Sequence, residues 1–263
     1  SFGTTTITGS AIHTNRSRNI NVASGTFTMT DSEVATSSVR VLQSGGGVTI
    51  RNSNIHDHAF RGITNTADAS TLTLIDSSLD NNGQAIFLDP DVLFTHSGNT
   101  AQGGGVNGIG MDGTQTTNRT WTRDLIPYVV FSATSSATGT VTLLPPATLT
   151  IDPGVVVKFR TNLSRLLVDT GATLDVNGTP AQPVIFTSFK DDDADGNDTN
   201  GDGVAKHDLV EQAVGLANVH FVGYQPVEDL PEVLASADLH VVPLRAGLGA
   251  VSVPSKSYSI MAA

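Results

Sequence analysis

Three short stretches that share one pattern decide the fold: FTMTDSEV (residues 27–34), VTIRNSNI (residues 48–55) and LTLIDSSL (residues 72–79). Each contains an apolar residue, Thr, a second apolar residue, a variable residue, Asp or Asn, Ser, a variable residue and a last apolar residue. The pattern recurs every 21 to 24 residues, a period typical of solenoids in which one coil is one unit.

Side chains alternate across a strand, so the two apolar residues that open each stretch face the same side, while the Asp/Asn–Ser pair turns the chain. A strand that returns to the same place one coil later pairs in parallel with its counterpart, about 4.8 Å away. Further strands are expected at residues 39–42, at Ile63 and at residues 85–88. The sequence therefore predicts a mainly β fold, a right-handed parallel β-helix, over residues 1–203.

Later stretches continue this pattern with shorter gaps: LTIDPGVVVKF (residues 149–159), ATLDVNGTPAQPVIFTS (residues 172–188) and DDDADGNDTNGDG (residues 191–203). They resemble the coils and closing loop of bacterial right-handed parallel β-helix proteins of the pectate-lyase-like architecture. The resemblance implies a secreted or cell-surface parent protein, although the chain shows no signal peptide. Residues 101–147, rich in Gly and Thr, are expected to form irregular coils or an inserted loop.

Composition excludes several classes of protein. A formal net charge of −11 argues against binding to nucleic acid, which requires clustered Lys and Arg. No apolar run reaches the roughly 18 residues of a membrane span. The absence of cysteine excludes disulfides and thiolate metal sites.

The acidic stretch at residues 191–202 has the spacing of a calcium-binding loop, with Gly196 at the sixth position and an acid at the twelfth. A structural Ca²⁺ ion is expected, held weakly because an Asp stands where the bidentate Glu normally lies. The alternative is a solvated acidic turn that binds nothing. The predicted ligands are Asp191, Asp193, Asp195, Asn197, Asp198 and Asp202.

One cluster on the predicted coils could carry catalysis on a polysaccharide. Its candidate residues are His56, Asp57, His58, Arg61 and Asp80. Asp/His pairs can act as general acids and bases, and Arg can neutralise a uronic acid. The competing interpretation is structural: Asp31, Asn52 and Asp76 share one repeat position and would form a stacked turn ladder, with His56 and His58 as exposed loop residues.

The style of the sequence changes at NGDG (residues 200–203). From there, GDG (201–203), NVHFVGYQP (218–226) and PSKSY (254–258) resemble the C-terminal nucleotide-sugar domain of retaining glycosyltransferases with two Rossmann-like domains. The resemblance implies that Pro254, Ser255 and Lys256 begin the helix that faces the donor. Because the acceptor domain and the diphosphate-binding residues are missing, residues 204–263 are expected to be an inactive fragment that caps the β-helix or joins a homo-oligomer.

The leading interpretation is a calcium-stabilised extracellular β-helix scaffold, with polysaccharide as the expected partner. The first alternative is a carbohydrate-active enzyme, a polysaccharide lyase or glycoside hydrolase, that uses the Asp and His side chains named above. The second is weak promiscuous hydrolysis by exposed His and Asp residues or by a bound metal.

Overall fold

The computed structural model describes residues 3–13, 18–22, 25–36, 38–41, 46–66, 70–132 and 139–191, together with Ala194, Leu216, Glu232, Ala235 and Ser236. It divides the chain into two compact units, Ser1–His220 and Phe221–Ala263. In the second unit, the described residues supply one helical hydrogen bond, from the Ser236 amide to the Glu232 carbonyl. The sheets of the described residues lie in the first unit, and within the same residues no helix has the length and apolar character of a membrane span.

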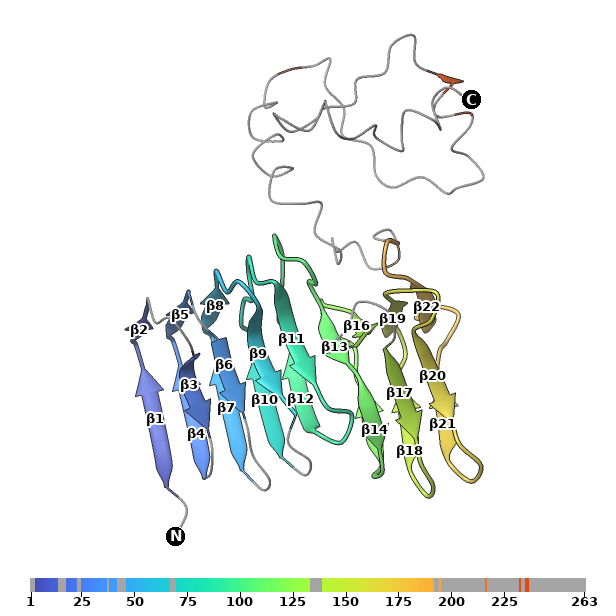
Figure 1. Ribbon diagram of the computed structural model, residues 1–263, viewed down its shortest axis with the longest axis horizontal. Helices are drawn as coiled ribbons and strands as arrows, with labels where there is room; N and C mark the ends of the chain where they lie inside the picture. Colours follow the sequence, from blue (N-terminus) through green and yellow to red (C-terminus); the bar gives the residue numbers. More distant parts are fainter. Residues whose placement is uncertain are drawn as a thin grey trace, which may run out of the picture. The chain divides into compact units, whose positions relative to one another are not determined.

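The first unit is a parallel β-solenoid, as the repeat predicts (Figure 1). One face is a five-stranded sheet of β1 (Thr4–Thr8), β4 (Thr26–Thr30), β7 (Gly47–Arg51), β10 (Thr71–Ile75) and β12 (Leu93–Ser97). A second is an eight-stranded sheet of β3 (Arg18–Val22), β6 (Ser38–Val41), β9 (Arg61–Asn65), β11 (Gln84–Leu88), β13 (Ile109–Met111), β16 (Tyr128–Val130), β19 (Val156–Phe159) and β22 (Ile185–Ser188).

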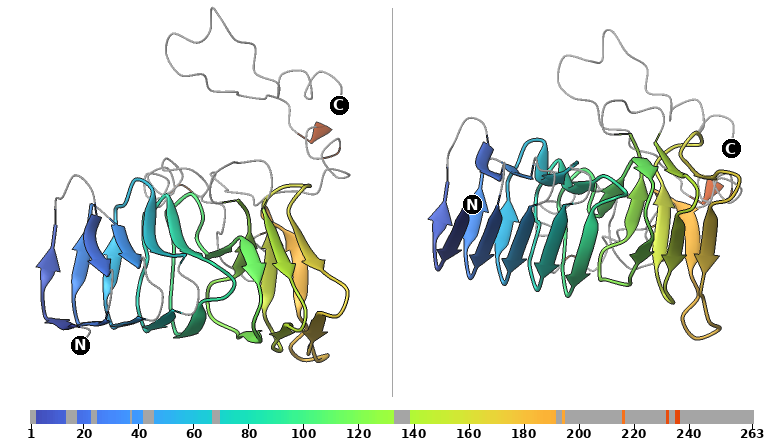
Figure 2. Two further views of the ribbon diagram at one scale, coloured as in Figure 1. Left: turned by 60° about the horizontal axis from the view of Figure 1, so that its bottom comes forward. Right: turned by 90° about the horizontal axis from the view of Figure 1, so that it is seen from below.

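Three smaller sheets complete the coils, and every pairing in the five sheets is parallel (Figure 2). The first contains β2 (Ala11–Ile12), β5 (Glu33–Ala35) and β8 (Asn54–His56). The second contains β14 (Gly113–Gln115), β17 (Thr140–Leu143) and β20 (Arg165–Val168). The third contains β15 (Arg119–Trp121), β18 (Thr148–Ile151) and β21 (Thr173–Val176).

The register follows the sequence repeat. Phe27 pairs with Val48, and Val48 with Leu72, so the three stretches stack residue on residue. Their apolar side chains point into the solenoid, where Met29, Ile50 and other residues of the core are fully buried. Of the two alternatives for residues 101–147, the structure shows irregular coils rather than an inserted loop, because the short strands β13 to β17 continue the solenoid; residues 133–138 lie outside the described part. These strands are short and interrupted by Gly, so the repeat period is not visible in the sequence.

Two columns of left-handed residues bend the chain in the coils that carry the five-stranded sheet. The first is Gly9, Asp31, Asn52, Asp76 and Gly98, all with φ between 46° and 67°. Asp, Asn and Gly tolerate this conformation better than other residues do. The predicted turn ladder at Asp31, Asn52 and Asp76 is thereby confirmed, and the Asn52 amide also donates to the Asp31 carboxylate.

The second column lies one short strand further along each coil. Its members are Thr36, Asp57, Asn81 and Gly103, with φ between 54° and 69°. The Asn81 amide donates to the Asp57 carboxylate at 2.5 Å, which links neighbouring coils at this bend.

A ladder of serines follows the first column. The backbone N–H groups of Ser10, Ser32 and Ser53 each donate to the serine hydroxyl of the next coil at 3.2 Å. Each hydroxyl in turn donates to the carbonyl two residues before it, at 2.7 to 2.9 Å. At Ser77 the acceptor becomes the Asn99 side chain, 3.1 Å away. Backbone groups that a sheet ladder does not pair are thus satisfied in the buried turn.

We predict that Ser53→Ala destabilises the protein by about 1–3 kcal/mol, because it leaves the buried Ser32 N–H without its acceptor and removes one of the two donors to the Arg51 carbonyl. Ser10→Ala is the matched control: it removes the same bond from an exposed residue and should cost less than about 0.5 kcal/mol. Urea unfolding measures both. Equal losses of unfolding free energy in the two variants would show that the buried part of the serine ladder contributes no more to stability than the exposed part.

Candidate functional site

A polar groove runs across five coils beside the first column of left-handed residues. We call it the corner groove. It has a volume of about 550 Å³ and is lined by Gly9, Ser10, Ala11, Asp31, Ser32, Glu33, Asn52, Ser53, Asn54, Asp76, Ser77, Ser78, Gly98 and Thr100. The chain bends at the left-handed residue and then continues into the next short strand, which is β5 or β8. Equivalent residues of successive coils therefore line the groove.

One wall of the groove presents a polar side chain from each of four coils, namely Glu33, Asn54, Ser78 and Thr100, whereas the first coil has Ala11 at this position. These residues occupy equivalent positions, as the bridges Asn54–Ser78 and Ser78–Thr100 show. The Ser78 hydroxyl donates to Asn54 Oδ1 at 2.9 Å, so part of this wall is held in place by contacts between coils.

His56 lies at the end of β8 between two carboxylates. Its Nε2 is 2.8 Å from Glu33 Oε1, and its Nδ1 is 2.8 Å from Asp57 Oδ2. His13 approaches the same Glu33 oxygen at 3.8 Å. An imidazole that hydrogen-bonds two carboxylates through both nitrogens is held in its protonated, doubly donating form. We call Glu33, His56 and Asp57 the carboxylate clamp.

The clamp shifts the pKa values of His56 and Asp57. Burial alone would lower the pKa of His56, but the hydrogen bonds to Glu33 and Asp57, with their charges, outweigh it and raise that pKa. The pKa of Asp57 is lowered, first by the hydrogen bond from Asn81 and then by the bond to His56. With both ring nitrogens hydrogen-bonded to carboxylates, His56 has no free lone pair and is a poor general base.

Asp80 lies in the coil after the clamp and carries the opposite shift. Burial raises the pKa of its carboxyl, against the opposing charge of His56 and a backbone hydrogen bond from Gln102. Its Oδ1 is buried and has no hydrogen-bond partner among the described residues. Of the predicted catalytic residues, the structure thus brings His56, Asp57 and Asp80 together.

His58 is buried, with 2% of its surface exposed, so the interpretation of His58 as an exposed loop residue is wrong. The chain turns at Asp57 and carries the next side chain inward. Burial, followed by the charge of His56, lowers the pKa of His58 to about 4, so its imidazole is neutral at physiological pH.

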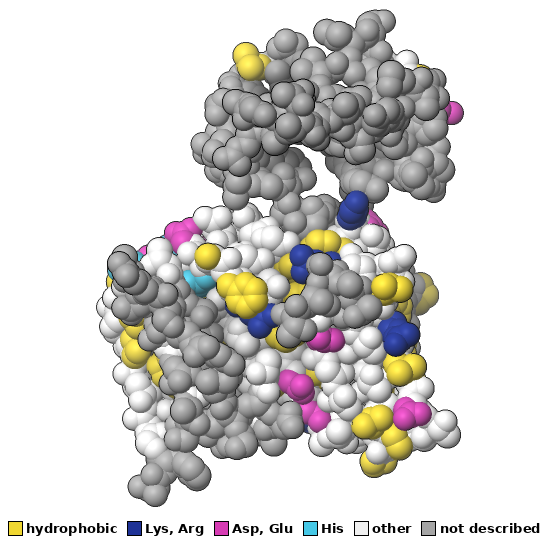
Figure 3. Space-filling view, viewed as in Figure 1, with side chains coloured by type: hydrophobic (Ala, Val, Ile, Leu, Met, Phe, Trp, Pro, Cys, Tyr) yellow, Lys and Arg dark blue, Asp and Glu magenta, His cyan; other side chains and the backbone are white. Residues whose placement is uncertain are grey.

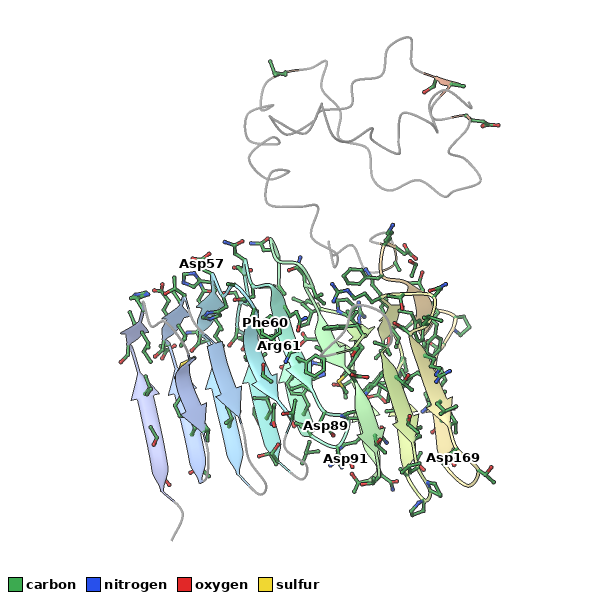
Figure 4. All side chains as sticks on the ribbon, viewed as in Figure 1. Asp57, Phe60, Arg61, Asp89, Asp91 and Asp169 are labelled. Atoms are coloured by element: carbon green, nitrogen blue, oxygen red, sulfur yellow. The ribbon has the colours of Figure 1, made fainter. Side chains whose placement is uncertain are left out.

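Arg61 is also largely buried, and it contacts a different set of residues. Its Nε donates to Gln84 Oε1 at 2.6 Å, and its guanidinium lies over the rings of Phe60 and Phe87, at 4.5 and 4.3 Å. Figure 4 shows Asp57 near the end of β8, with Phe60 and Arg61 over β9. In the same view, Figure 3 shows basic side chains against hydrophobic ones at this place.

The stack continues along the outside of the eight-stranded sheet. Phe87 meets Phe131 edge to face at 5.5 Å, and the Arg160 guanidinium lies between Phe131 and Phe189 at 5.1 and 5.7 Å. These phenylalanines form a second buried cluster with Val106 and Val129. Arg61 therefore packs in a stack of aromatic and cation–π contacts.

The sequence pattern missed Glu33 as a member of the site. The signal was present, because Glu33 holds the repeat position of Asn54 and Ser78. Only the fold brings its carboxylate to His56, which lies 23 residues later.

A second His–Asp pair was also missed. His96 Nδ1 is 2.9 Å from Asp124 Oδ2, and its Nε2 is 2.7 Å from the Tyr128 hydroxyl. The side chains of His96 and Asp124 are fully buried. Asp124 also accepts the Asn99 N–H at 3.1 Å, so this pair ends the turn ladder at the last strand of the five-stranded sheet.

The predicted calcium ligands lie outside the described residues, except for Asp191. The Asp191 carboxylate accepts hydrogen bonds from the Thr187 hydroxyl and from the Ala194 N–H, the latter at 3.3 Å. Within the described part of the chain, no three His, Asp or Glu side chains are grouped as a metal site would require.

Comparison with known proteins agrees with this architecture. A family model described as a pectate-lyase-like β-helix domain matches residues 128–201. No curated protein and no solved structure matches the chain. The protein therefore contains a pectate-lyase-like β-helix domain. The resemblance of residues 201–258 to a glycosyltransferase has no support in these comparisons, and the elements expected there fall almost wholly outside the described residues.

The clamp predicts a pH-dependent contribution to stability. Because the pKa of folded His56 is raised, its contribution is fully present below about pH 6.5, the value for a free imidazole, and is lost as the pH rises through the raised value. We expect the melting temperature of the wild-type protein to exceed that of His56→Gln at pH 6, and the difference between the two temperatures to shrink towards pH 9. Thermal unfolding of both proteins across this range measures it, and a difference independent of pH would contradict the protonated clamp.

Proposed function

We propose that this protein is an extracellular β-helix scaffold that binds a linear glycan along the corner groove. The observation that carries the proposal is the groove itself, which has a volume of about 550 Å³ and presents one polar side chain from each of four successive coils. A linear ligand with repeating hydroxyl groups can hydrogen-bond to a polar side chain in each of these coils. The match of residues 128–201 to a pectate-lyase-like domain is consistent with a role in carbohydrate binding.

The charge of the groove points to neutral glycans. Asp31, Glu33 and Asp76 contribute carboxylates, and none of the lining residues is Lys or Arg. A polyuronate would meet like charges in this groove, which disfavours binding. Neutral sugars instead offer hydroxyls to the carboxylate, amide and hydroxyl groups of the wall.

We expect the full chain to bind neutral oligosaccharides more tightly as their length increases up to the five coils of the groove. The double variant Asn54→Ala/Ser78→Ala should weaken binding at least about tenfold, the equivalent of about 1.4 kcal/mol. Thr142→Ala, on β17 outside the groove, is the matched control. Calorimetric titration with neutral and uronate oligosaccharides measures this. An affinity that is unchanged in the double variant would show that the glycan binds outside the corner groove.

A second function, glycan cleavage, is favoured by one observation: Asp80, with its raised pKa, lies beside the charged clamp. A protonated carboxyl can protonate a leaving oxygen. The same oligosaccharides should then be tested for new reducing ends and unsaturated products. Loss of product formation in Asp80→Asn with binding retained would favour the enzyme, whereas binding without products would favour the scaffold.

The scaffold proposal includes a structural calcium ion held by residues 191–202. At a calcium concentration ten times the dissociation constant, we expect about 1.4 kcal/mol of stabilisation, or roughly 3–6 °C in melting temperature. Asp193→Asn/Asp195→Asn should abolish this shift, and Asp175→Asn, which removes an exposed carboxylate elsewhere, should not. Melting curves in calcium and in chelator make the test, and a shift retained by the double variant would contradict the site.

For residues 204–263 we propose an inactive glycosyltransferase-like segment that caps the β-helix or contributes to a homo-oligomer. Their apolar residues, among them Leu209 and Val233, need a surface to pack against. Sedimentation of the full chain against a chain ending at Gly203 would reveal a contribution to self-association.

A further inference from the structure

The outer face of the five-stranded sheet is an array of threonines. Fifteen positions face outward on its strands, three from each, and ten of them are Thr. The middle row is complete: Thr6, Thr28, Thr49, Thr73 and Thr95 pair in unbroken register across all five strands. The other five members are Thr4, Thr8, Thr26, Thr30 and Thr71. We call these ten residues the threonine array.

The spacing of the array is fixed by the backbone. Neighbouring strands of a sheet lie about 4.8 Å apart, and residues i and i+2 along a strand lie about 6.6 Å apart. Parallel pairing without a bulge holds this rectangle over five strands, whose arrows run side by side with little twist in Figure 2. The branched Thr side chain has few rotamers, so methyls and hydroxyls repeat with the backbone.

The array faces solvent and carries almost no charge. Thr4, Thr26, Thr71 and Thr95 are exposed, and Thr49 is half-buried. In a chain with 39 charged residues, Arg51 is the one charged side chain among the fifteen outward positions. Hydrogen bonding within the array is slight: the described contact is Thr26 Oγ1 to Thr4 Oγ1, at 3.1 Å. Most hydroxyls therefore keep capacity for water.

We propose that the threonine array binds the surface of ice crystals. A row of hydroxyls at a fixed spacing close to the oxygen repeat of ice holds water molecules in lattice-like positions, and the methyls between them fill the gaps. Ordering one water costs up to about 2 kcal/mol, so an array that has already ordered many of them meets the crystal with this cost reduced. The rigid solenoid keeps the hydroxyls at a fixed spacing, and the lack of charge avoids strongly bound water that would not match the ice lattice.

Two competing roles for the array predict different behaviour. Thr favours strands and pairs well across them, so the array could serve stability alone. A crystalline polysaccharide would prefer a platform of aromatic rings, and none of the fifteen outward positions is aromatic. The absence of rings favours ice over a sugar surface.

The test uses the full chain in a nanolitre osmometer, with crystal shape and the gap between freezing and melting points as readouts. We expect wild type to facet ice crystals and to open a gap that grows with protein concentration. Thr49→Lys/Thr73→Lys should lose both effects, because two long charges stand in the middle row. Thr142→Lys, also half-buried in the middle of a strand but outside the array, should retain them.

Circular dichroism establishes whether each variant is folded. If Thr49→Lys/Thr73→Lys does not fold, Thr73→Tyr takes its place in the test, because Tyr is well tolerated in β-strands. Unshaped ice crystals with wild type would overturn the proposal, as would equal activity in wild type and the array variants. Binding to powdered cellulose or chitin that depends on Thr49 and Thr73, without any effect on ice, would assign the face to a polysaccharide and also overturn it.

Discussion

The buried serine turn keeps the coils in register, and the rest of the structure depends on that register. Each hydroxyl accepts an N–H from one coil and donates to a carbonyl of its own coil, so neither backbone group is left unpaired in the corner. The left-handed residue before each serine bends the chain there. A slip of one residue would turn the apolar side chains outward and leave these groups unsatisfied.

Both candidate surfaces follow from this register. The corner groove exists because equivalent residues bend the chain in five successive coils, and the threonine array exists because the neighbouring strands repeat without a bulge. The carboxylate clamp is a local departure from the repeat: Glu33 and His56 replace neutral residues where two coils meet. Repetition thus provides extended surfaces, and single substitutions within it provide chemistry.

The regular part of the fold could be predicted from the sequence because one apolar pattern recurs every 21 to 24 residues. That pattern predicted the buried faces of β4, β7 and β10 and the turn at Asp31, Asn52 and Asp76. It failed at residues 109–143, where strands of three or four residues are too short to show alternation.

The candidate site was predicted only in part. His56 and Asp57 are adjacent in the sequence and Asp80 follows one repeat later, so the repeat pattern groups them, whereas Glu33 and the buried pair of His96 and Asp124 are joined to their partners only by coil stacking. Burial of His58 and Arg61 depends on which way a turn carries the next side chain, which composition does not reveal.

The most direct test of the account is residue-resolved amide hydrogen exchange of the Ser32, Ser53 and Ser77 N–H groups. Because each of them donates to a buried side-chain oxygen of the next coil, the account predicts exchange as slow as that of the central strands β7 and β10. Exchange at the rate of exposed turns would show that the serine ladder does not hold the coils together.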